Sequence, residues 1–87
     1  MHTIYKYPID IVLHQTVVLP LKATIIHVGL DPQGKPCVWA EVCTDIKQTV
    51  EWNIYIVGTG NPRRDEARTH LGSFKENDMF MWHVYTD

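Results

Sequence analysis

Residues 24–43, TIIHVGLDPQGKPCVWAEVC, decide the fold of this chain. On both sides of a central turn the side chains alternate in character, as when Val38 and Ala40 alternate with Trp39 and Glu41. A period of two that is rich in β-branched and aromatic residues is typical of half-buried antiparallel strands. The central residues, 31–34, place Asp, Pro and Gly where a type I turn prefers them. The stretch therefore predicts two strands joined by a tight turn.

The same period recurs along most of the chain and predicts strands near residues 3–7, 15–19, 22–30, 36–43, 49–57, 69–74 and 79–86. One helical candidate runs from Pro62 to Thr69, because proline suits a first helical position and acidic residues precede Arg68. Short, evenly spaced strands favour an all-β fold, or β with one short helix. We expect a single β domain over residues 1–87, built as a small antiparallel sandwich or barrel-like roll of about six to seven strands.

Composition excludes several classes of protein. The 87 residues carry a net charge of −2, which does not suit a general nucleic-acid binder with a basic face. No apolar run approaches the ~20 residues of a membrane span, and no signal peptide is recognisable. We therefore expect a soluble protein that stays in the compartment where it is made.

The two cysteines and five histidines do not predict a metal site or a disulfide. Cys37 and Cys43 would lie ~20 Å apart on one strand, beyond the ~7 Å that a disulfide allows between Cα atoms. No two histidines have metal-ligand spacing on one element. We expect two free thiols, no metal and no cofactor.

The sequence offers no convincing catalytic group. Cys43 lies on a strand rather than at the start of a helix that would lower its pKa. Ser73, the only serine, has no nucleophile-elbow motif around it. We expect a protein that is not an enzyme, with no catalytic residues.

One stretch could hold an anion or an acidic partner. Gly58, Thr59 and Gly60 end a predicted strand, and all three arginines of the chain follow: Arg63, Arg64 and Arg68. Glycines allow a turn that exposes backbone N–H groups, and guanidinium groups bind phosphate or carboxylate. The alternative is that the segment is only a connecting loop. The motif is neither a dinucleotide fingerprint nor a P-loop.

Two aromatic side chains are possible contacts for a partner. Trp39 lies opposite the Val38/Ala40/Val42 set on its strand, and Tyr55 lies opposite the Trp52/Ile54/Ile56 set on the next. Apolar side chains on both faces of 37–43 and 79–85 would need cover on both, which one small sheet cannot supply. We therefore expect a homo-oligomer.

Three blocks carry a resemblance to a known family: CVWAEV at residues 37–42, IVGTGNP at 56–62 and FMWHVY at 80–85. In this order the chain resembles a family of small phage- and prophage-encoded proteins of uncharacterised function. It departs from that pattern at Arg63 and Arg64, where a less basic loop would be usual.

The resemblance implies a phage protein that acts in the cytoplasm of a bacterial host. We expect a non-enzymatic, counter-defence binding protein. It would block a host defence protein, such as a CRISPR effector, or sequester an anionic nucleotide signal. The alternatives are a small nucleic-acid-binding β domain and a virion or assembly component.

Overall fold

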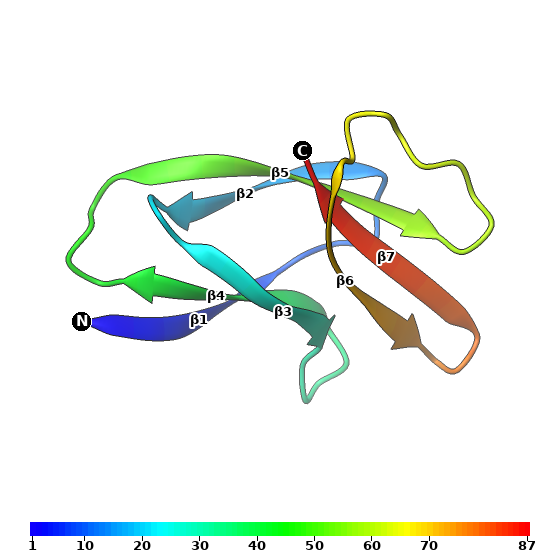
Figure 1. Ribbon diagram of the computed structural model, residues 1–87. Helices are drawn as coiled ribbons and strands as arrows, with labels where there is room; N and C mark the ends of the chain where they lie inside the picture. Colours follow the sequence, from blue (N-terminus) through cyan, green and yellow to red (C-terminus); the bar gives the residue numbers. More distant parts are fainter.

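Seven antiparallel strands and no helix make up the protein, for which the computed structural model describes residues 1–87 (Figure 1). Each expected strand is present within two residues of its predicted bounds, which confirms the all-β fold. The strands are β1 (His2–Pro8), β2 (His14–Pro20), β3 (Thr24–Leu30), β4 (Pro36–Cys43), β5 (Thr49–Gly58), β6 (Thr69–Glu76) and β7 (Phe80–Thr86).

The strands form two sheets that pack face to face in a sandwich. One sheet has the order β1-β4-β3 and the other β2-β5-β7-β6. The sheets also approach each other edge to edge, where β3 lies beside β6. A Cβ atom on Gly72 would come within 3.1 Å of the Val28 Cβ, so only glycine permits this approach without displacing a neighbour. The arrangement matches the expected sandwich or barrel-like roll.

The core lies between the two sheets and follows the alternation of the sequence. From β4 it receives Val38, Ala40 and Val42, all at most 1% exposed. From the four-stranded sheet it receives, among others, Ile54 and Val84, which are fully buried. These inner faces remove apolar surface from water, which is the main source of stability in a folded domain.

Two turns show why the strands reverse where they do. The Gly34 N–H donates to the Asp31 carbonyl at 2.8 Å, and Gly34 adopts a φ of +81°, so the predicted turn over residues 31–34 is confirmed. Between β6 and β7, Asn77 and Asp78 both have positive φ, 54° and 58°. Two successive residues of this kind give the tight reversal of a type I′ turn, which asparagine and aspartate tolerate best.

The predicted helix over 62–69 is wrong. Residues 59–68 form turns and irregular loop, and the only backbone hydrogen bond between two residues of 62–69 joins the Ala67 N–H to the Arg64 carbonyl. The Arg63 side chain donates to the Ala67 and Arg64 carbonyls. In a helix these carbonyls would accept backbone N–H groups instead. A helix of one or two turns gains too few hydrogen bonds to offset the cost of its first turn.

The two cysteines lie on β4 as expected, and both are free thiols, Cys37 buried and Cys43 half-buried. The chain contains no helix long and apolar enough to cross a membrane.

Candidate functional site

A hollow of about 340 Å³ opens where β5 ends and the β6–β7 hairpin continues. The last strand pair between β5 and β7 is Gly58 with Trp82, whereas β6 and β7 remain paired as far as Glu76 with Phe80. The hairpin therefore projects past the end of β5. The hollow is lined by Gly58, Thr59, Asn61, Met79, Phe80, Met81 and Trp82.

The hairpin side of the hollow is apolar and exposed. Met79 is 76% exposed, Phe80 52% and Met81 41%. Trp82 is half-buried and packs against the core, and its ring centroid lies 5.9 Å from that of Phe80. Its indole N–H donates to the Glu76 carboxylate at 3.1 Å, so its polar atom is satisfied while its ring remains available.

The opposite wall is a turn that needs its two glycines. The Asn61 N–H donates to the Gly58 carbonyl at 3.0 Å, and Gly60 has a φ of +89°, the geometry of a type II turn. A Cβ on Gly58 would lie 3.0 Å from the Trp82 ring and 2.9 Å from the Asn61 side chain. The glycine at 58 therefore lets the turn approach the tryptophan.

A chain of hydrogen bonds ties this turn to the hairpin. The Thr59 hydroxyl donates to the Met81 carbonyl at 3.4 Å and lies 2.7 Å from His83 Nε2. On the other side of the ring, His83 Nδ1 lies 2.8 Å from the Ser73 hydroxyl. The His70 Nε2 lies 3.0 Å from the same hydroxyl. The network holds the wall of the hollow in place.

Ser73 and His83 are as close as a catalytic nucleophile and its general base, but the other ring nitrogen of His83 contacts a hydroxyl. Thr59 occupies the position where a catalytic triad has a carboxylate to stabilise an imidazolium. No three histidine, cysteine or carboxylate side chains of the chain lie close enough to hold a metal ion.

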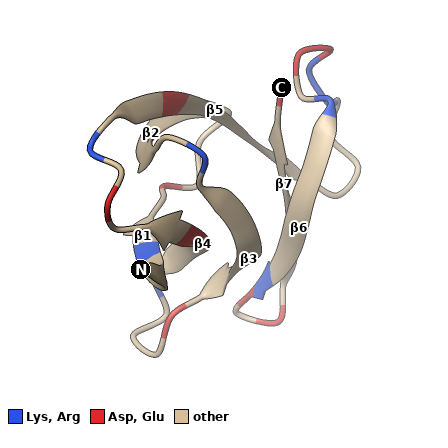
Figure 2. Cartoon of the chain, turned by 60° about the vertical axis from the view of Figure 1, so that its left-hand side comes forward, with Lys and Arg blue, Asp and Glu red and all other residues tan.

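The three arginines lie outside the hollow, and two of them contact tyrosines on the outer face of the four-stranded sheet. The Arg63 guanidinium is 5.9 Å from the centre of the Tyr85 ring, and that of Arg64 is 5.6 Å from the centre of the Tyr55 ring. Arg64 also pairs with Glu66 at 3.1 Å. The third, Arg68, has no side-chain hydrogen bond within the chain. Figure 2 shows basic and acidic segments side by side in this loop.

Two backbone N–H groups of the loop, which an anion would need as donors, already have partners within the chain. The Thr59 N–H donates to the Met81 carbonyl and the Asn61 N–H to the Gly58 carbonyl. Of the residues proposed to bind an anion or partner, the structure brings Gly58 and Thr59 to the hollow and places Arg63 and Arg64 over the sheet. Sequence reasoning missed the hairpin residues Met79–Trp82, although their apolar run at the chain's last turn was a signal.

The two aromatic candidates lie on opposite sheets. Trp39 is half-buried on the outer face of the three-stranded sheet, with its ring 5.1 Å from that of His27. Tyr55 is only 5% exposed, because His14 stacks on it at 4.8 Å and Arg64 lies over it. Trp39 thus keeps an accessible surface, and most of Tyr55 is covered.

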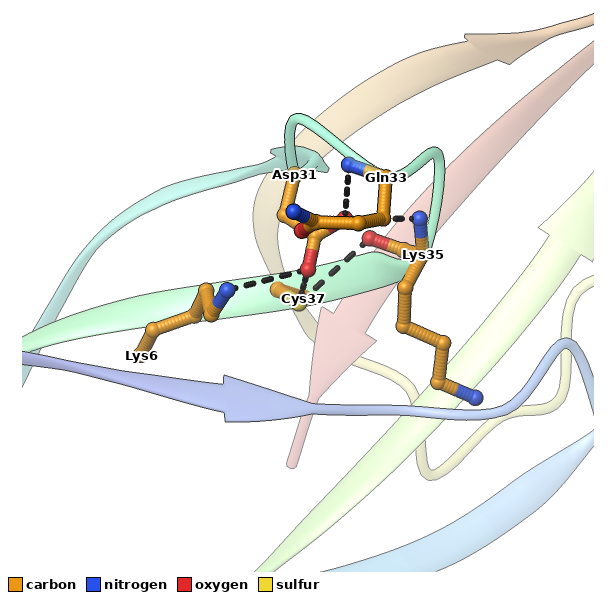
Figure 3. Close-up of polar contacts among 5 residues, drawn as sticks. All are labelled: Lys6, Asp31, Gln33, Lys35 and Cys37. Carbon is orange, nitrogen blue, oxygen red and sulfur yellow. Dashed lines mark hydrogen bonds and ion pairs between the residues drawn. The ribbon is translucent and has the colours of Figure 1, made fainter.

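A second polar cluster lies at the turn between β3 and β4 (Figure 3). The Asp31 carboxylate accepts the backbone N–H of Lys35 at 2.9 Å, that of Gln33 at 3.0 Å and the Lys6 ammonium at 2.9 Å. The Lys35 and Lys6 bonds are the main reasons why the pKa of Asp31 is lowered. Burial raises the pKa of the neighbouring Cys37 thiol. The cluster fixes β1 to this turn, so we assign it a structural role.

A search of curated proteins finds no match to the chain, and a search of solved structures finds none either. The model of the family described as Domain of unknown function (DUF7352) matches residues 1–87, so the chain belongs to this family, an uncharacterised one as its motifs predicted.

Proposed function

We propose that this protein is a non-enzymatic binding protein that holds a partner protein at the hollow between the β6–β7 hairpin and residues 58–61. The observation that carries the proposal is the run of exposed apolar side chains, Met79 to Met81, beside a half-buried tryptophan. Exposed apolar patches around a concavity are typical of protein interaction sites. Aromatic side chains in such pockets often supply most of the binding energy.

The resemblance to phage-encoded proteins suggests which class of partner protein the site would bind. In a bacterial host, a small protein that binds and blocks a defence protein, such as a CRISPR effector, needs an interaction surface and no catalytic group. We propose this counter-defence role, in the host cytoplasm, for the hollow and the hairpin.

A protein partner suits the site better than an anionic nucleotide signal. The lining of the hollow contains no arginine or lysine. Two of the three arginines in the neighbouring loop already have intramolecular partners. The same observation disfavours a nucleic-acid site, which would need free cations along a groove.

The test is differential capture from a lysate of the bacterial host with the tagged protein and two matched variants. Phe80→Asp places a charge on the hairpin, whereas Leu13→Asp changes an exposed apolar side chain that does not line the hollow. We expect the parent and Leu13→Asp to capture the same host defence protein, and Phe80→Asp to lose it. Capture that survives in Phe80→Asp would refute the site.

Salt and nuclease treatment distinguish the alternatives. Binding centred on apolar side chains should change little as salt is raised, whereas binding to nucleic acid should weaken steeply. A captured species that disappears after nuclease treatment, or that proves to be a bound nucleotide, would replace the proposed protein partner.

A further inference from the structure

The open edge of β1 has backbone groups that no part of the chain uses. β1 pairs with β4 in an unbroken register from His2–Cys43 to Pro8–Cys37, and no strand lies on its other side. At the two ends of this ladder, the Thr44 N–H donates to the Met1 carbonyl and the Ile9 N–H to the Pro36 carbonyl.

These two bonds fix which residues face outward. Hydrogen-bonded pairs alternate along an antiparallel ladder, so the backbone groups of residues 1, 3, 5, 7 and 9 point to β4. The N–H and C=O groups of His2, Ile4 and Lys6 then point away from the sheet. An edge of this kind is a template for another strand.

β1 carries few of the features that normally protect an edge. It has no bulge against β4, and its only proline, Pro8, is at the end of the strand. Its only charged side chain, Lys6, forms an ion pair with Asp31 on the neighbouring turn. Ile4 is 52% exposed and Tyr5 48%. At the opposite side of the sandwich, β3 and β6 protect each other's edges by lying side by side.

We propose that β1 pairs with β1 of a second copy of this chain, antiparallel and centred on Ile4. In this register Ile4 lies opposite its own counterpart, and His2 lies opposite Lys6 of the other copy. Every outward N–H and C=O group of these three residues then has a partner, and Pro8, which has no N–H, remains outside the pairing. A second copy suits the edge because an antiparallel strand pair is self-complementary about a two-fold axis.

The dimer joins two three-stranded sheets into one of six strands. Such a contact is small, so we expect weak self-association, visible by sedimentation equilibrium in the micromolar range. The apparent mass should rise with concentration from 10.1 kDa toward twice that value.

Three variants test the register and the edge. Ile4→Lys places two ammonium groups opposite each other and should weaken the dimer roughly tenfold or more. Ile4→Pro removes an outward N–H and no bond to β4, so it should give a folded monomer. Val18→Lys, at an equally exposed position on the open edge of β2, should leave the dimer unchanged.

Circular dichroism shows whether each variant keeps the parent's fold. A parent that remains at 10.1 kDa at every concentration would overturn the proposal. Retention of the dimer by both Ile4 variants, or its loss in Val18→Lys, would also overturn it. Because partner capture depends on Phe80, failure of the dimer and failure of the proposed function are separate results.

Discussion

Replacing Arg63 with alanine should destabilise the fold, because this side chain holds residues 63–67 over the sheet. Its guanidinium donates to the carbonyl of Ala67, which is fully buried, and lies over the Tyr85 ring. A carbonyl left without its partner costs about 1–3 kcal/mol. A cation–π contact at an exposed site contributes about 0.5–1 kcal/mol. Together these terms predict that Arg63→Ala lowers the free energy of unfolding by about 1.5–4 kcal/mol.

The other two arginines serve as graded controls. Arg64 has an ion pair with Glu66, in which both side chains are about half exposed, and a contact with Tyr55. Exposed pairs contribute about 0–1 kcal/mol, so Arg64→Ala should cost less than Arg63→Ala. Arg68 makes no side-chain hydrogen bond, so Arg68→Ala should change stability by at most about 0.5 kcal/mol.

The assay is urea unfolding followed by tryptophan fluorescence, with the free energy taken by linear extrapolation. Equal stability of the Arg63→Ala variant and the parent would refute the structural role. So would an equal loss in all three variants, because a general effect of removing positive charge would then explain the result.

Three further outcomes are expected. Gly58→Val should destabilise the protein by about 1–3 kcal/mol and shift its tryptophan emission, because the new side chain meets the Trp82 ring; unchanged emission would contradict the close approach at the hollow. The lowered pKa of Asp31 means that its carboxylate stabilises the fold above its ordinary pKa of 3.8, and that this contribution is lost as the pH falls through the lowered value. Urea midpoints measured from neutral to acid pH should therefore fall less steeply in Asp31→Asn, and parallel curves would contradict this role. In a timed thiol titration Cys43 should react in the native protein and Cys37 only on unfolding, because Cys37 is buried and burial raises its thiol pKa. Equal reaction rates of the two thiols in the native protein would contradict the packing of β4.

The strands could be predicted from the sequence because their signal is local. Val38, Ala40 and Val42 alternate with Trp39 and Glu41, and residues 31–34 contain the residue types that a type I turn prefers. Both features act over a few residues and need no knowledge of the partner strand. The pairing of β1 with β4, or of β2 with β5, joins segments tens of residues apart, and nothing in one sequence states it.

The site was harder to predict for the same reason. The hollow exists because β5 ends at Gly58 while the hairpin continues to Glu76 and Phe80, a difference in length that only the strand register reveals. The arginines were expected to be free for a ligand, but Arg63 and Arg64 lie over Tyr85 and Tyr55, which come from two different strands. The helix over 62–69 failed because its local signals were weaker than these tertiary contacts.

Residues 58–68 therefore form two parts with different surroundings, although the sequence suggested a single site. The glycine turn faces the hollow and approaches Trp82, whereas the arginines anchor the following residues to the outer face of the same sheet. We therefore expect substitution of the arginines to lower stability without altering the lining of the hollow. The β1 edge belongs to the other sheet, so a dimer formed there leaves both hollows open. Two such hollows on one particle would favour a partner that is itself repeated or dimeric, because the second contact forms at a high effective concentration.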